Sequence, residues 1–129
     1  MPNQRYVQGN RYEARAAEQL RTNGYLAYQT RGSKSPADIV AIKPDRIGCH
    51  VLLVQVKGGL STSITGNEWN ALYELAHAYG ARPIVCERVS LERAPIALRW
   101  KQITGWHEEY SRDWPSRPFL MDEVMHGGE

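Results

Sequence analysis

Two runs of β-branched and aliphatic residues, 37–42 and 51–57, lie on either side of one short polar segment. Such runs are typical of β-strands, and a connection this short joins neighbouring antiparallel strands. Polar residues interrupt both runs, with Asp38 in the first and with Gln55 and Lys57 in the second. Because alternate residues of a strand point to the same side, Gln55 and Lys57 share one face. The strand pair therefore predicts that a carboxylate, an amide and a cation lie near one another.

Further elements flank this strand pair. Apolar residues at helical spacing predict two helices, and short β-branched runs bounded by turn residues predict three more strands. In chain order the expected elements are a helix from Arg11, capped by Asn10 or Gly9, to Gly24; strands at 25–30, 37–42 and 51–57; a helix capped by Thr65 or Asn67 that ends near Gly80; and strands at 83–89 and 96–103. The order α-β-β-β-α-β-β predicts an α/β fold, a mixed β-sheet of about five strands flanked by helices.

The chain has 129 residues, enough for one domain with a real core. We expect that domain at residues 1–103 and an irregular acidic C-terminal tail at residues 104–129. The tail carries six acids and two bases, a net charge of −4, so residues 1–103 hold +6 of the total of +2. A basic body favours a polyanionic partner such as DNA, although by charge alone an ordinary soluble surface is an equal alternative.

The sequence shows no pattern typical of a membrane span, a signal peptide, a disulfide framework or a zinc site. The chain has no apolar run of the roughly 18 residues that a membrane span needs and no signal-peptide pattern at its N-terminus, so we expect a cytoplasmic protein. Cys49 and Cys86 do not form a CxxC pair, and we expect both to be free thiols. The four histidines lack the spacing of a zinc site. Any metal is therefore expected to be bound through oxygen.

The polar residues of the strand pair fit metal-assisted hydrolysis of a phosphodiester. That reaction needs oxygen ligands for a hard cation and a positive group near the attacking water. Asp38, the side-chain carbonyl of Gln55 and the backbone carbonyl of Val56 can supply the ligands, and Lys57 can lie beside the water. Glu13 adds a second carboxylate if the first helix packs across the strands.

Each of these assignments has a purely structural alternative. Asp38 can be a buried acid satisfied by backbone amides, and Gln55 with Lys57 can occupy the solvent face of an amphipathic strand. Glu13 can be a solvated helix residue, and Ser33 has by composition the character of a turn residue.

Short motifs follow one another along residues 5–103. They are Gly9 four residues before Glu13; Asn23-Gly24-Tyr25; Arg31-Gly32-Ser33-Lys34; Asp38-Ile39-Val40-Ala41; Val54-Gln55-Val56-Lys57; and His77-Ala78-Tyr79-Gly80-Ala81-Arg82-Pro83. None is specific alone, but their order and spacing resemble the PD-(D/E)XK nuclease superfamily, and within it the archaeal-type Holliday junction resolvases.

This resemblance implies a restriction-endonuclease-like core and a homodimer that binds a four-way DNA junction and cuts two opposed strands symmetrically with Mg²⁺, for which Mn²⁺ can substitute. Carried over by position, Glu13, Asp38 and Gln55 would be metal-site residues, Lys57 the catalytic lysine, and Ser33 the serine that contacts the scissile region. The residues expected to hold DNA phosphates are Arg5, Arg11, Arg15, Arg31 and Lys34.

The chain departs from the family pattern at two positions. Gln55 stands where the family has Glu, which should weaken cation binding, and Ala14 stands where the family usually has Arg. An amide oxygen is still a legitimate ligand, so an active enzyme is favoured. Two alternatives stay open: another DNA nuclease of the superfamily, of the repair, restriction-like or exonuclease kind, and a catalytically degenerate DNA-binding module, for which Gln55 is the positive argument.

Overall fold

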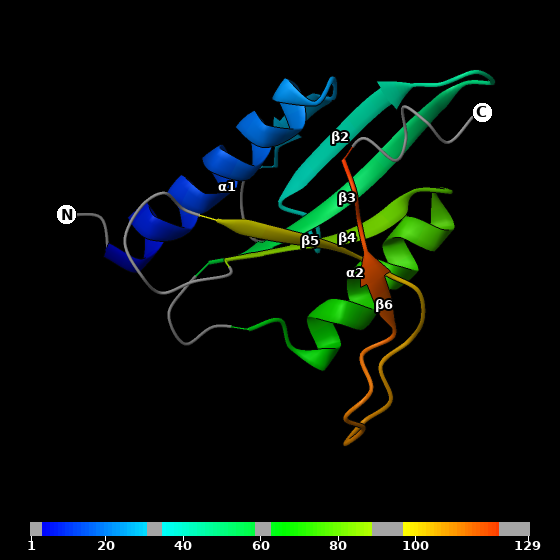
Figure 1. Ribbon diagram of the computed structural model, residues 1–129. Coiled ribbons are helices and arrows are strands. Elements are labelled where there is room, and N and C mark those ends of the chain that lie inside the picture. The colour runs from blue at the N-terminus through cyan, green and yellow to red at the C-terminus, as the bar shows by residue number, and fades with distance from the viewer. Residues whose placement is uncertain (1–3, 31–34, 59–62, 89–96, 122–129) are drawn as a thin grey trace.

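The structure of the chain is a computed structural model, which describes residues 4–30, 35–58, 63–88 and 97–121, with side chains from residue 11 onward. Figure 1 shows one helix on each side of a twisted sheet. The elements are α1 (Gln4–Thr22), β1 (Leu26–Gln29), β2 (Ile39–Pro44), β3 (Cys49–Lys57), α2 (Gly66–Ala78), β4 (Arg82–Arg88), β5 (Leu98–Ile103) and β6 (Ser116–Pro118). The predicted order is confirmed, and one further strand follows it.

The six strands lie in the sheet in the order in which they occur in the chain, β1-β2-β3-β4-β5-β6. β2 and β3 pair antiparallel, as predicted, with Ile39 opposite Val54 and Lys43 opposite His50. β3 and β4 pair parallel, which requires a crossover connection, and α2 lies in that connection. The other neighbouring strands are antiparallel, so the sheet is mixed as expected.

Alternation along β3 divides the core between the two faces of the sheet. Val54 and Val56 belong to the apolar cluster that includes α1, whereas Leu53 belongs to the cluster that includes α2. Because side chains alternate along a strand, Gln55 and Lys57 lie with Leu53 on the α2 face. The face that the sequence assigned to these two polar residues is therefore the one that α2 covers.

α1 begins at Gln4, so the start predicted at Arg11 is wrong. Gly9 and Asn10, which were expected to cap the helix, lie inside it. A glycine inside a helix costs only about 1 kcal/mol relative to alanine, which burial of the following turns can offset. The predicted end is correct, because Gly24 has a φ of 92°, the left-handed conformation common after a helix C-terminus.

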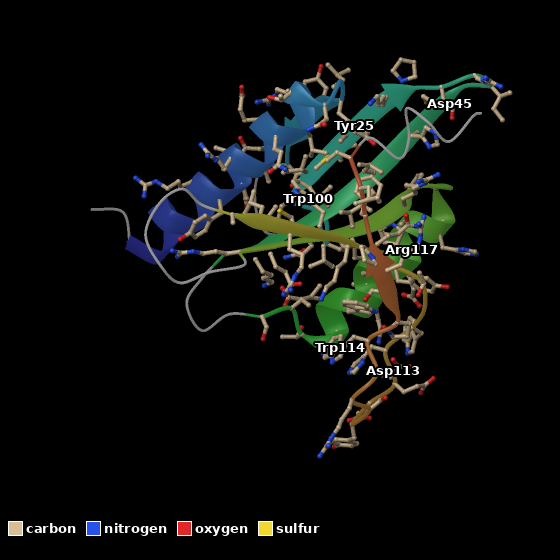
Figure 2. All side chains as sticks on the ribbon, in the orientation of Figure 1. Tyr25, Asp45, Trp100, Asp113, Trp114 and Arg117 are labelled. Atoms are coloured by element: carbon tan, nitrogen blue, oxygen red, sulfur yellow. The ribbon has the colours of Figure 1, made fainter. Side chains whose placement is uncertain are left out.

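The segment after β5 is not simply an irregular tail. Ser116–Pro118 pairs with β5 as a sixth strand, and Phe119 is buried. Trp114 is labelled in Figure 2. It packs edge-to-face against Trp69 of α2 with ring centroids 5.1 Å apart, and His107 stacks on it with ring centroids 3.6 Å apart. These aromatic residues have no period in the sequence; contacts with α2 and within the segment itself position them. Residues 122–129 lie outside the described part of the chain.

Candidate nuclease site

Asp38 immediately precedes β2, whereas the sequence predicted it within the strand. Its backbone N–H donates to the carbonyl of Val54 at 2.7 Å, and its backbone carbonyl accepts from Thr30 N–H at 2.8 Å. Its side-chain Oδ2 accepts a hydrogen bond from Val56 N–H at 2.8 Å. Strand pairing on both sides thus holds the carboxylate over the C-terminal end of β3, beside the residues predicted to share its site.

Burial raises the pKa of Asp38 above its ordinary value. The hydrogen bond from Val56 and the charge of Lys57 act in the opposite direction, and the charge of Glu68 adds to the increase. The pKa of Glu13 is also raised, by burial first and then by the negative charge of Asp38. The structure therefore places Glu13 of α1 within electrostatic range of Asp38. Two partly buried carboxylates within electrostatic range of each other suit a bound cation.

Gln55 lies in the middle of the sheet, opposite Val85 of β4, and is 8% exposed. Within the described part of the chain, its side-chain amide makes no hydrogen bond. Its amide atoms are not among the fully buried side-chain atoms that lack a partner, so they keep some contact with water. No protein group engages the amide oxygen in the described part of the chain, so it can accept a ligand.

The residues that the sequence predicted as cation ligands would all donate oxygen, from the carboxylates of Glu13 and Asp38, the amide of Gln55 and the backbone carbonyl of Val56. Such donors fit a hard divalent cation such as Mg²⁺, which usually takes one or two carboxylates and keeps several waters. Among the described residues, no three His, Cys, Asp or Glu side chains are close enough to share an ion.

Lys57 forms an ion pair that the sequence did not reveal. Its Nζ lies 2.7 Å from Oε2 of Glu68, in the first turn of α2. Burial would raise the pKa of Glu68, but hydrogen bonds from Lys57 and Thr65, together with the charge of Lys57, lower it. The available signal was Thr65-x-x-Glu68, which is the pattern of a capping box at the start of a helix.

α1 is held against the site through Tyr12, the neighbour of Glu13. Arg88 of β4 donates a hydrogen bond to the Tyr12 hydroxyl at 2.7 Å and lies over its ring at 5.5 Å. Gly58, which directly follows Lys57, has the Tyr12 ring where a Cβ would be. A glycine after Lys57 thus lets α1 approach the end of β3, and this approach brings Glu13 to Asp38.

The predicted phosphate-binding residues are only partly described. Arg11 and Arg15 are exposed and stand one turn apart on α1, so they share one side of the helix. The side chain of Arg5 and the residues Arg31, Ser33 and Lys34 lie outside the described part of the chain, and their roles stay predictions. Neither described helix combines the length and hydropathy required of a membrane span.

Comparison with known proteins finds similarity among solved structures. None of the protein-family models and no curated protein sequence matches the chain. The chain is similar to the solved structure of Hjc from Archaeoglobus fulgidus, a Holliday junction resolvase from an archaeal hyperthermophile, with 27% identity and a TM-score of 0.55 over 72% of this chain and 70% of that chain. The mixed sheet flanked by helices and this similarity confirm the predicted restriction-endonuclease-like α/β fold.

Proposed function

We propose that this protein is a metal-dependent endonuclease that resolves four-way DNA junctions as a homodimer by symmetric phosphodiester cleavage. The observation that carries the proposal is the Asp38 carboxylate, which accepts a hydrogen bond from Val56 N–H beside Lys57 and lies within electrostatic range of Glu13. The similarity to Hjc, described as a Holliday junction resolvase, supports junction DNA as the substrate.

The residues of the site divide into cation ligands and one residue that supplies positive charge. Glu13, Asp38, the Gln55 amide and the Val56 carbonyl would hold Mg²⁺ or Mn²⁺. The cation, when bound, stabilises negative charge that develops on the scissile phosphate. The ammonium group of Lys57 would add positive charge near the scissile phosphate, beside the attacking water.

Residues other than the cation ligands and Lys57 would position the DNA. Arg11 and Arg15 present two guanidinium groups on one side of α1, and guanidinium groups bind phosphates without reading sequence. Arg5, Arg31 and Lys34 would extend this surface, and Ser33 would contact the scissile region.

A single assay separates the proposal from its alternatives. A labelled four-way junction, a duplex and a single strand are each incubated with the protein and Mg²⁺. Paired, symmetric nicks in the junction alone support a resolvase. Cleavage of duplex or single strand at equal rates indicates another nuclease, and binding of the junction without cleavage in Mg²⁺ or Mn²⁺ indicates a DNA-binding module.

Gln55 is the specific reason to retain the DNA-binding module as a second candidate, since an amide holds a cation more weakly than a carboxylate. Replacing Gln55 with glutamate should lower the Mg²⁺ concentration for half-maximal cleavage by about threefold to tenfold, because the site gains a negative charge. Titration of Mg²⁺ and Mn²⁺ in the junction assay measures this change. An unaltered metal requirement would remove Gln55 from the cation site.

The homodimer has a suitable surface on β1 and β2. Leu26 and Tyr28 are 55% and 59% exposed and lie opposite Ile42 and Val40 of β2, so four apolar side chains share one face of the sheet. α1 packs on the opposite face, and α2 packs on β3 and β4, where its cluster partly covers Val40; Leu26 and Tyr28 are the exposed part of this face. A second copy of the chain would bury this apolar face.

Replacing Tyr28 with glutamate should therefore convert a dimer into a monomer, because the dimer would bury an unpaired charge. Size-exclusion chromatography with light scattering measures the mass. Ile47→Glu is the control, since Ile47 is 98% exposed in the turn between β2 and β3. A Tyr28→Glu protein that remains dimeric would place the interface elsewhere.

A further inference from the structure

Lys57 lies between two carboxylates but is hydrogen-bonded to only one of them. Its Nζ is 2.7 Å from Oε2 of Glu68, whereas its interaction with Asp38 is electrostatic, without a hydrogen bond between the two side chains. The Oδ2 atom of Asp38 accepts from Val56 N–H instead. The neighbouring carboxylate on β4, Glu87, is 2.8 Å from Lys101 and is thus already paired.

The Glu68 carboxylate is oriented independently of Lys57. Its Oε1 accepts from Thr65 N–H at 3.0 Å, while Thr65 Oγ1 accepts from Glu68 N–H at 3.1 Å, which forms a complete capping box. One carboxylate oxygen therefore belongs to the helix cap, and the other is left pointing at Lys57. Forming the ion pair restricts mainly the lysine side chain, which lowers its entropic cost.

The segment after β5 stiffens the same turn of α2. Trp69 Nε1 donates to the carbonyl of Gly105 at 3.0 Å. The side chain of Asn70 accepts from His107 N–H at 2.7 Å and donates to the His107 carbonyl at 3.0 Å. These contacts hold both residues that follow Glu68, so the position of its carboxylate is fixed by the fold.

We propose that Glu68 is a positioning residue for Lys57, which keeps the ammonium group away from Asp38 and leaves the Asp38 carboxylate free for the divalent cation. If the ammonium group of Lys57 paired with Asp38, it would compete with the divalent cation for that carboxylate. Cation binding would then be weaker. Gln55, on the same face of the sheet, is neutral and so cannot replace Glu68 as an ion-pair partner of Lys57. The inference rests on the proposed function, because it assigns the cation to Asp38.

Cation binding tests the inference without any measurement of cleavage. Mn²⁺ affinity is measured by titration followed by electron paramagnetic resonance, for the unaltered protein and for Glu68→Gln, Lys57→Met and the double variant. Glutamine keeps the oxygen that accepts from Thr65 N–H, so the helix cap should survive. Glu68→Gln should weaken Mn²⁺ binding by about threefold to tenfold, since Lys57 then pairs with Asp38.

The double variant separates positioning from direct ligation. With Lys57 absent, Glu68→Gln should change Mn²⁺ affinity by less than about twofold, because there is no ammonium left to displace. Glu74→Gln is the matched control, as Glu74 is exposed on the same helix, and it should leave the affinity unchanged. Thermal unfolding of each variant checks that the fold is retained.

The remaining outcomes each overturn a defined statement. An unchanged affinity in Glu68→Gln would overturn the positioning role alone. An equal loss of Mn²⁺ affinity in Glu68→Gln and in the double variant would also overturn it, because Glu68 would then act on the cation directly. If the unaltered protein bound no Mn²⁺, both the proposed function and this inference would fail.

Discussion

Asp38→Asn is expected to lower the rate of junction cleavage by about a thousandfold or more, while the affinity for the junction changes by less than about threefold. A bound cation supplies several kcal/mol of stabilisation to the transition state, and each 1.4 kcal/mol or so corresponds to a factor of ten in rate. Asparagine keeps an oxygen that can accept from Val56 N–H, so the strand geometry should persist. Junction affinity depends instead on phosphate contacts at other residues.

Thermal unfolding in a chelating buffer distinguishes this loss of chemistry from a loss of fold. A carboxyl group whose pKa is higher in the folded chain than in the unfolded chain stabilises the fold at low pH, and this contribution is lost as the pH rises through the folded pKa. The raised pKa of Asp38 therefore makes its charge unfavourable to folding at neutral pH. Asp38→Asn should unfold at an equal or higher temperature at pH 7, and the difference should shrink as the pH falls through the raised pKa of Asp38. A variant with lost cleavage and a much lower unfolding temperature would contradict the assignment.

The strand pair at the centre of the sheet was predictable because its signals are local. β2, β3 and their antiparallel pairing follow from the β-branched runs at 37–42 and 51–57 and the turn between them. No knowledge of the rest of the chain is needed. The same alternation puts Gln55 and Lys57 on one face. The displacement of Asp38 to the position before β2 could not be predicted, because it depends on hydrogen bonds to Val54 and Thr30 from two other segments.

The features that the sequence did not reveal depend on contacts between distant residues. Glu68 resembles an ordinary capping-box residue until α2 is packed on β3, 11 residues away from Lys57 in the chain. β6 is short and fully exposed, so it has neither the length nor the apolar alternation of a recognisable strand. The close approach of Gly58 and Tyr12 likewise appears only when α1 lies on the sheet. The missing information was where these residues lie in space relative to one another, which their order along the chain does not show.

Lys57→Met is expected to reduce cleavage by about a hundredfold to a thousandfold without weakening Mn²⁺ binding, because it removes positive charge from the reacting phosphate and no ligand from the cation. Methionine has nearly the same length as the apolar part of lysine, so packing on the α2 face should be retained. Single-turnover cleavage at saturating Mg²⁺ measures the loss, and junction affinity should stay within about threefold.

The matched control for Lys57→Met is Lys101→Met. Lys101 and Glu87 form a second ion pair on the same face of the sheet, at 2.8 Å, with side-chain exposures of 25% and 19% against 17% and 34% for Lys57 and Glu68. Both variants leave a carboxylate without its ammonium partner, so both should destabilise the fold to a similar extent. Only Lys57→Met should affect the chemical step, because only Lys57 adjoins Asp38 and Val56. Equal losses of cleavage in the two variants would trace the effect to stability, and Lys57 would then have no role in the reaction.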